Sequence, residues 1–319
     1  MMDILDHPKV RLRDFIVTRE GWIFSSADYH HTYGVRGVLR YVPDPEGERT
    51  DGTRNYRKYD FDEAYDYMDI HKPEWVQDVH IIPWDQVERV LSPTDRLAGI
   101  WRLDPRTEEI TRTLLEAGIP MDSMGVTGSF LPGLQISGSD IDLVVYGPQW
   151  FRARDIIARA KDDPHSSIEH LDEGMWERIY NKRIPEIDFR EFKLHEMRKG
   201  NRGMVGDTYF DLLFVRDWDQ VNEPLGRGTD LGHETIEAVV LDSGLAFDSP
   251  SVYKVDHPEI GYVLSYTHTY AGQALSGETI EARGMVEEVN GHRRLVVGTS
   301  REPKGEWIRS LSLLRSSGQ

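Results

Sequence analysis

The chain has 319 residues, and 39% of them are apolar, which is enough for two or three domains with cores of their own. It contains no cysteine, so disulfides, thiolate metal sites and a cysteine nucleophile are excluded. The formal net charge of −17 argues against a protein that binds nucleic acid through bulk electrostatics, because such binding neutralises phosphates with Lys and Arg.

Targeting and membrane segments are not visible in the sequence. Residues 1–14 alternate in charge and lack an apolar core, and no segment approaches the length of a membrane span. We therefore expect a cytoplasmic protein with no membrane partner.

The first third of the chain has the pattern of a β-rich domain, which we place at residues 1–96. Residues 13–26 predict a hairpin, and residues 34–42 predict a third strand. Two short helices are expected after a polar loop, over 61–68 and 83–91.

The middle of the chain, residues 97–232, alternates helical and strand patterns. An amphipathic helix with acidic residues in its first turn is followed by two short strands. Two more helices come next, then a helix that ends in a basic turn, and then a strongly apolar strand. In order, the predicted elements cover 104–118, 124–128, 140–147, 149–160, 168–180, 188–203 and 208–215.

The last part, residues 233–319, shows short strands separated by turns. Strand patterns cover 261–270, 278–289 and 292–300. Asn290-Gly291 predicts a tight hairpin between the last two. Several short strands in this space predict a small barrel or sandwich.

Two aspartates stand in the apolar stretch "DIDLVV". Residues two apart in a strand face the same way, so Asp140 and Asp142 are expected to project together. Side-by-side carboxylates raise each other's pKa unless a cation shares them. Their hard oxygen ligands favour Mg²⁺ or Mn²⁺, whose remaining ligands come from water and substrate phosphates. The alternative is a helix-capping or turn acid next to a solvated acid of an edge strand.

The glycine and serine at 128 and 129 complete a possible nucleotide site. Gly128 lets the backbone approach a ligand closely, and the N–H groups of Ser129 and Phe130, with the Ser129 hydroxyl, are placed to donate to phosphate oxygens. Phosphate donors and metal ligands then converge from consecutive strands.

The segment "GSFLPGLQISGSDIDLVV" resembles the signature of the polymerase-β-like nucleotidyltransferase superfamily. In that signature a Gly-Ser pair is followed, after about ten residues, by Gly-Ser-Asp-x-Asp and apolar residues. Gly138 and Ser139 stand at the second Gly-Ser, so the resemblance adds Ser139 to the nucleotide-binding residues. The whole chain also resembles an archaeal group of predicted nucleotidyltransferases. The implied fold is an α+β core, a mixed sheet with helices, flanked here by the N-terminal β-rich domain and a C-terminal β-barrel or OB-like domain.

The resemblance implies a third carboxylate on a later strand. Asp211 is the favoured candidate, because it is a single acid inside the apolar strand "TYFDLLFV". Asp188 is the alternative, although it precedes a helical pattern and also fits an N-cap. Asp140, Asp142 and Asp211 are then the catalytic and metal-binding set.

The basic turn "RKGNRG" has two interpretations that the sequence leaves open. Arg198, Lys199 and Arg202 either contact the phosphates of a nucleotide or acceptor, or form an ordinary solvated helix end.

The implied reaction is the attack of an acceptor hydroxyl on the α-phosphate of a nucleoside triphosphate, with pyrophosphate leaving and two metal ions assisting. We expect ATP as donor, and RNA or another nucleic acid as acceptor because of the added β-barrel. The alternatives are adenylylation of a protein and a non-catalytic nucleotide- or RNA-binding module. The sequence does not indicate an oligomeric state.

Overall fold

The computed structural model describes residues 7–222, 226–298 and 304–318. The chain divides into two compact units. The first comprises residues 1–169 and 203–224, and the second comprises residues 170–202 and 225–319. The three-domain division expected from the sequence stays a prediction. Within the described part of the chain, no helix has both the length and the apolar character needed to cross a membrane.

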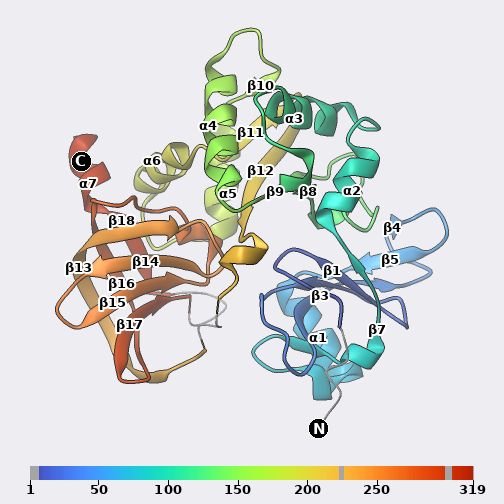
Figure 1. Ribbon diagram of the computed structural model, residues 1–319, viewed down its shortest axis with the longest axis horizontal. Coiled ribbons are helices and arrows are strands. Elements are labelled where there is room, and N and C mark those ends of the chain that lie inside the picture. The colour runs from blue at the N-terminus through green and yellow to red at the C-terminus, as the bar shows by residue number, and fades with distance from the viewer. Residues whose placement is uncertain (1–6, 223–225, 299–303, 319) are drawn as a thin grey trace. The chain divides into compact units, whose positions relative to one another are not determined.

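The first unit begins with an antiparallel sheet and one helix (Figure 1). The strands lie in the order β4-β5-β3-β2-β1-β7, and β6 pairs with β3. The predicted hairpin, third strand and first helix are confirmed. The elements are β1 Phe15–Thr18, β2 Ile23–Ser26, β3 Val35–Pro43, β4 Arg49–Thr50, β5 Asn55–Lys58, α1 Phe61–His71, β6 His80–Ile82 and β7 Val87–Leu91, with a single helical turn at Pro73–Trp75.

The helix predicted over 83–91 is wrong. Only Trp84–Gln86 forms a turn of 3₁₀ helix, and the following residues form β7. Ile16 of β1 pairs with Val90 of β7 in an antiparallel ladder. The β-branched valines suit that ladder, so tertiary pairing outweighs the local helical pattern.

A second sheet in the first unit has the strand order β10-β11-β12-β9-β8. β9 and β12 are parallel, whereas β8 and β9 are antiparallel, so the sheet is mixed. Helix α4 packs against β9 and β12 (Figure 1), and its Trp150 Nε1 donates to the Leu212 carbonyl across 3.3 Å. The expected α+β class with a mixed sheet and helices is confirmed. The elements are α2 Pro93–Ile100, α3 Pro105–Glu116, β8 Met124–Val126, β9 Ile141–Tyr146, α4 Gln149–Asp162, β10 Ile168–Glu169, β11 Arg202–Val205 and β12 Thr208–Val215, with 3₁₀ turns at Met121–Ser123, Gly128–Phe130 and Trp218–Gln220.

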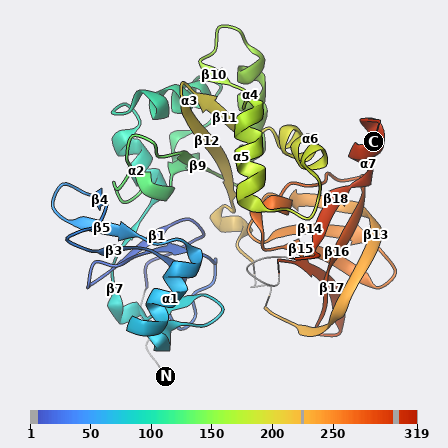
Figure 2. The same ribbon diagram turned by 180° about the vertical axis from the view of Figure 1, so that it is seen from behind.

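The second unit combines α-helices with a β-sheet that closes on itself (Figure 2). The pairing path runs β13-β14-β15-β17-β16 and returns to β13, while β18 adds to β16. β15 and β17 are parallel, and the other pairs of the ring are antiparallel. The elements are α5 Glu173–Arg183, α6 Phe189–Lys199, β13 Thr229–Leu245, β14 Ser251–Asp256, β15 Ile260–Ser265, β16 Thr279–Val289, β17 His292–Val297, β18 Trp307–Ser310 and α7 Leu311–Ser316, with a 3₁₀ turn at His268–Tyr270.

Three details of the second unit bear on the sequence predictions. The hairpin at Asn290-Gly291 is confirmed, with φ angles of 52° and 78° at the two turn residues. The strand expected over 261–270 ends at Ser265, because a 3₁₀ turn follows. The strand expected over 292–300 ends at Val297, and residues 299 and 300 lie outside the described residues.

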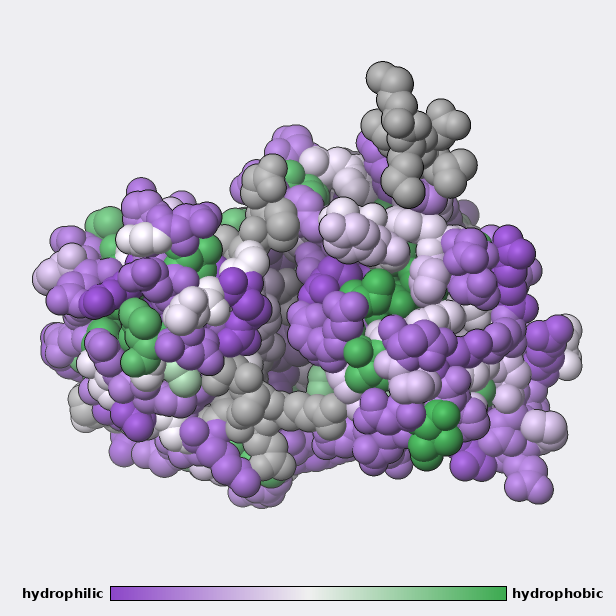
Figure 3. Space-filling model, turned by 90° about the horizontal axis from the view of Figure 1, so that it is seen from below, coloured by the Kyte–Doolittle hydropathy of each residue, from purple (hydrophilic) through white to green (hydrophobic). Residues whose placement is uncertain are grey.

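The core of the second unit joins helix α6 to the closed sheet. Phe192 of α6 lies in one cluster with Ile236 of β13 and Tyr253 of β14. The face of the molecule seen in Figure 3 is largely polar, with apolar residues in small separate patches. That distribution agrees with a chain in which 29% of the residues are charged.

Candidate active site

Two carboxylates lie side by side on the parallel strands β9 and β12. Asp211 is the register partner of Asp142, so both side chains leave the sheet at the same level and on the same face. Asp211 is buried and Asp142 is partly buried. The structure therefore brings together two of the three carboxylates selected from the sequence.

The third carboxylate stands at the edge of the pair. Asp140 is exposed and directly precedes β9, two residues before Asp142. Tyr209, two residues before Asp211 on β12, donates its hydroxyl to Asp211 Oδ2 across 3.3 Å. The buried member of the set is thus oriented by a hydrogen bond, and the exposed member faces solvent.

The electrostatics of the pair are those of two acids in a confined space. Burial raises the pKa of Asp142 to about 6, and the carboxylates of Asp211 and Asp140 act in the same direction. The guanidinium groups of Arg13 and Arg40 oppose the rise. A cation shared by the carboxylates would relieve this repulsion.

The backbone of Gly128 lies directly against the side chain of Asp142. It has a φ of 62°, in the left-handed region that glycine adopts without strain. A Cβ atom built on Gly128 would overlap with Oδ2 of Asp142. The glycine predicted from the sequence is therefore needed both for the turn and for the close approach of the carboxylate.

The residues after Gly128 contribute in different ways. Ser129 is partly buried, and its hydroxyl has no hydrogen-bond partner in the part of the chain that the structure describes. Phe130 is fully buried, and its carbonyl accepts from Arg96 Nε across 2.8 Å. Ser139 Oγ accepts a hydrogen bond from the Ile136 N–H across 2.9 Å, so this hydroxyl supports the loop before β9.

Arg13 was not selected from the sequence. It lies at a φ of 74°, which is unusual for a residue other than glycine. Its carbonyl accepts from Thr127 Oγ1 across 2.9 Å, which ties it to the residue before Gly128. Burial lowers the pKa of Arg13, whereas Asp142 and Asp211 act to raise it, so this cation lies within the field of both carboxylates. The local sequence does not predict that Arg13 lies near the carboxylates. A left-handed turn and a hydrogen bond with a residue 114 positions away hold it in place.

Asp188, the alternative third carboxylate, caps helix α6. Its Oδ1 accepts from the Glu191 N–H across 2.8 Å, which is the N-cap arrangement considered from the sequence. The residue is exposed and belongs to the second unit. The capping geometry accounts for Asp188 without a metal.

The basic residues at the end of α6 make contacts within the second unit. Lys199 Nζ donates to Glu196 Oε1 across 2.5 Å, and Arg202 pairs with the same buried glutamate. Arg198 pairs with Glu278 across 2.5 Å. Lys199 and Arg202 thus form a buried network with Glu196, and Arg198 forms a separate, partly buried ion pair, so this is not a solvated helix end. Their phosphate role stays a prediction.

The carboxylate pair meets the chemical requirements of a divalent cation. Mg²⁺ commonly takes one or two protein carboxylates and completes its shell with water and substrate phosphates. Asp142 and Asp211 supply that pair, and the absence of a side chain at Gly128 lets the Asp142 carboxylate lie against the backbone there. Within residues 7–222, 226–298 and 304–318, no three acidic or histidine side chains converge as a complete metal-ion cage. The donor set thus fits an ion that binds together with a substrate.

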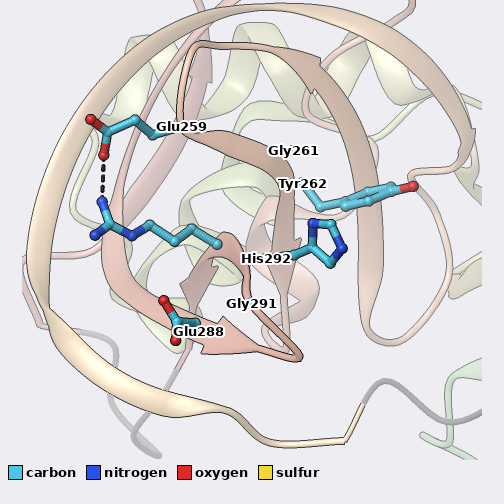
Figure 4. Close-up of a pocket in the computed structure, with 7 residues that line it drawn as sticks. Glu259, Gly261, Tyr262, Glu288, Gly291 and His292 are labelled. Atoms are coloured by element: carbon cyan, nitrogen blue, oxygen red, sulfur yellow. Dashed lines mark hydrogen bonds and ion pairs between the residues drawn. The ribbon is translucent and has the colours of Figure 1, made fainter.

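A separate surface cavity lies on the closed sheet of the second unit (Figure 4). Its volume is about 340 Å³, and Tyr262 and His292 line it. Arg293 and Glu259 also line it and form an ion pair with each other across 2.5 Å. This cavity contains none of the predicted site residues.

Comparisons with known proteins give the family. Residues 107–199 match the model of the nucleotidyltransferase domain. An uncharacterized protein of Methanocaldococcus jannaschii, MJ1086, is 37% identical to this chain, and the alignment covers 94% of this chain and 99% of the relative. No solved structure matches the chain. The chain belongs to the polymerase-β-like nucleotidyltransferase superfamily, in a group that includes this archaeal protein.

Proposed function

We propose that the protein is a nucleotidyltransferase that depends on Mg²⁺ or Mn²⁺ and transfers AMP from ATP to a hydroxyl of a nucleic-acid acceptor. The observation that carries the proposal is the pairing of Asp142 with Asp211 on adjacent parallel strands, with Gly128 directly beneath Asp142. The match of residues 107–199 to the nucleotidyltransferase domain supports the transfer of a nucleoside monophosphate in general.

Asp142 and Asp211, with Asp140 at the edge, are the residues that would hold the ion. When bound, a divalent cation neutralises charge on phosphoryl oxygens and lowers the barrier to in-line displacement. In the transfer, the acceptor oxygen forms a bond to the α-phosphorus while the bond to the pyrophosphate oxygen breaks. Pyrophosphate leaves with the bonding electrons, and Asp211 takes the proton of the acceptor hydroxyl.

The protein's own groups position the reactants. Tyr209 orients the Asp211 carboxylate through its hydroxyl. The Ser129 hydroxyl is available to a phosphate oxygen, because it has no hydrogen-bond partner among the described residues. Fixed donors and acceptors of this kind lower the barrier by preorganisation, since they need not reorient during the reaction.

The choice of acceptor rests on the second unit. Small closed β-sheets often present a face to oligonucleotides, and the strand path of β13 to β17 forms such a ring. This support comes from fold analogy. The net charge of −17 favours a protein or small-molecule acceptor instead, so the acceptor needs a direct test.

Labelled nucleotides provide that test. The wild-type protein, Asp142→Asn and Asp211→Asn are incubated with each α-labelled nucleoside triphosphate, Mg²⁺ and cell extract. Asp188→Asn is the matched control, because asparagine also caps helices. We expect transfer by the wild type and by Asp188→Asn, and a loss of at least about 10²-fold in the other two variants.

The nature of the product separates the alternatives. Label that is removed by RNase supports the proposed acceptor, whereas label that is removed only by protease identifies a protein as the acceptor. Nucleotide binding without transfer or pyrophosphate release, with all four nucleotides, would establish a non-catalytic module and overturn the proposal.

A further inference from the structure

One arginine of the N-terminal sheet, Arg40, influences the charge of Asp142 and has no side-chain partner among the described residues. Arg40 is partly exposed in strand β3, outside the residues that match the nucleotidyltransferase domain. Its guanidinium forms no hydrogen bond or ion pair with any residue that the structure describes. By contrast, Arg36 on the same strand pairs with Asp28 and Asp78, across 2.7 and 2.6 Å.

A β-bulge sets the position of Arg40. Ile23 of β2 pairs with Tyr41 of β3, but the next residue, Phe24, pairs with Leu39. Arg40 is therefore an extra residue on β3, opposite no residue of β2. Bulges of this kind redirect side chains and occur frequently beside active sites.

Beside the bulge, β3 packs against the segment that leads to β9, the strand that carries Asp142. Leu39 packs into the core of the N-terminal sheet, whereas Tyr41 packs against Leu131 and Leu134. Those two leucines belong to the segment that joins Gly128 to β9. In a regular strand, residues two apart face the same way, so the opposite orientations of Leu39 and Tyr41 result from the bulge.

Electrostatics also relate Arg40 to Asp142. Burial is the largest influence on the pKa of Asp142 and raises it, while Arg40 acts in the opposite direction. Burial likewise raises the pKa of Tyr41, and both Arg40 and Arg49 oppose this rise. Arg49 donates to the Leu134 carbonyl across 3.3 Å, so its guanidinium is engaged, unlike that of Arg40.

We propose that Arg40 is a phosphate-binding residue that holds the triphosphate of the nucleotide beside Asp142. The inference rests on the proposed function, because an ion held by Asp142 would take its other ligands from those phosphates. A guanidinium forms strong, often bidentate hydrogen bonds with phosphate oxygens. The N-terminal sheet thereby contributes a residue to a site whose carboxylates come from the other sheet of the same unit.

Binding measurements on purified full-length protein test the role of Arg40. The probes are Mg²⁺–ATP, Mg²⁺–tripolyphosphate, Mn²⁺ alone and a single-stranded oligonucleotide. The variants are Arg40→Gln and Arg40→Lys, and Arg89→Gln is the matched control, because Arg89 is an exposed arginine on β7 of the same sheet. Since Arg40 has no side-chain partner among the described residues, its variants should unfold at the wild-type temperature.

We expect Arg40→Gln to weaken Mg²⁺–ATP and Mg²⁺–tripolyphosphate binding by at least about tenfold, the loss of a charged hydrogen bond. Mn²⁺ alone should bind as tightly as before or more tightly, because a positive charge near Asp142 has been removed. The affinity of Arg40→Lys for both phosphate ligands should lie between those of the wild type and Arg40→Gln, since lysine keeps the positive charge but lacks the planar, bidentate guanidinium. Arg89→Gln should match the wild type.

Three results would overturn the inference: unchanged tripolyphosphate binding in Arg40→Gln, a parallel loss of Mn²⁺ binding, or a loss confined to the oligonucleotide. A wild-type protein that binds Mn²⁺ but no nucleoside triphosphate would instead refute the proposed function itself. The two failures are therefore distinguishable.

Discussion

Gly128 has no room for a side chain, because a Cβ atom there would overlap with Oδ2 of Asp142. Gly128→Ala should therefore displace the carboxylate and lower nucleotidyl transfer by at least about 10²-fold. The left-handed φ of 62° adds strain of about 1 kcal/mol to the free energy of folding. Labelled-nucleotide transfer and urea unfolding measure the two effects.

Gly206 offers a matched control for this substitution. It has a similar φ of 54°, but nothing lies within 4 Å of a Cβ atom built there. Gly206→Ala should lose similar stability and keep its activity. Equal activity losses in the two variants would show that backbone strain, and not the contact with Asp142, explains the effect.

Asp142→Asn should make the metal-free protein more stable while it abolishes transfer. The like charges of Asp142 and Asp211 are neighbours on adjacent strands, and removal of one charge relieves their repulsion. A gain on the order of 1–2 kcal/mol in the free energy of unfolding is expected when EDTA is present. Addition of Mg²⁺ should stabilise the wild type and not the variant. A variant that is less stable than the wild type in EDTA would argue against repulsion at this pair.

The outcome at individual residues shows what local patterns predict and what they do not. The family resemblance implies a third carboxylate on a later strand, and Asp211 fits because it is a single acid inside an apolar strand; the register of β12 with β9 places it beside Asp142. Asp188 fitted a helix cap from its sequence context, and the structure has it in that geometry. In both cases the information lies within a few residues of the aspartate.

Arg13 and Arg40 show the limit of that information. Arg13 reaches the site through a left-handed turn, and Arg40 reaches it through a bulge in β3. Arg13 is tied to Thr127, far along the chain, and the bulge depends on the register between β2 and β3; residue spacing encodes neither. The same reason explains why residues 83–91 form mainly β7 and not a helix.

Asp14 should make the protein less stable as the pH rises from about 4 to about 7. Burial raises the pKa of Asp14 to about 7, so the folded chain retains a proton that the unfolded chain loses near pH 3.8. The contribution of Asp14 to the free energy of unfolding is therefore complete below about pH 4. It decreases as the pH rises from 4 to 7, because only the unfolded chain loses the proton in this range. Asp14→Asn keeps the acceptor for the Arg11 N–H and should be more stable than the wild type at pH 8 by a few kcal/mol.

The two proteins should differ little in stability at pH 4, because the wild-type carboxyl is then neutral in the folded chain and still partly protonated in the unfolded chain. Urea unfolding at pH 4, 6 and 8 measures the difference. A difference that stays constant across this range would contradict the raised pKa of Asp14.

His195 of the second unit should give the opposite pH dependence. Its Nδ1 lies 2.8 Å from the Glu191 carbonyl, and its Nε2 accepts from the Ser310 N–H across 3.0 Å. The neutral imidazole satisfies both partners, whereas a proton on Nε2 would break the bond to Ser310. Burial lowers the pKa of His195 to about 4.

Stability from His195 should be complete above about pH 6.5 and should fall as the pH drops toward 4, because the unfolded chain binds the proton first. The loss is about 3 kcal/mol for a buried histidine with this shift. The readout is the change in unfolding free energy of the second unit between pH 7 and pH 4.5, which should shrink in His195→Gln and stay unchanged in His165→Gln, where the histidine is exposed. If the first variant does not fold, NMR titration of the wild-type imidazole measures the same pKa. A value near 6.5 would contradict the hydrogen-bonding argument, because both ring nitrogens would then be free to carry protons in the folded state.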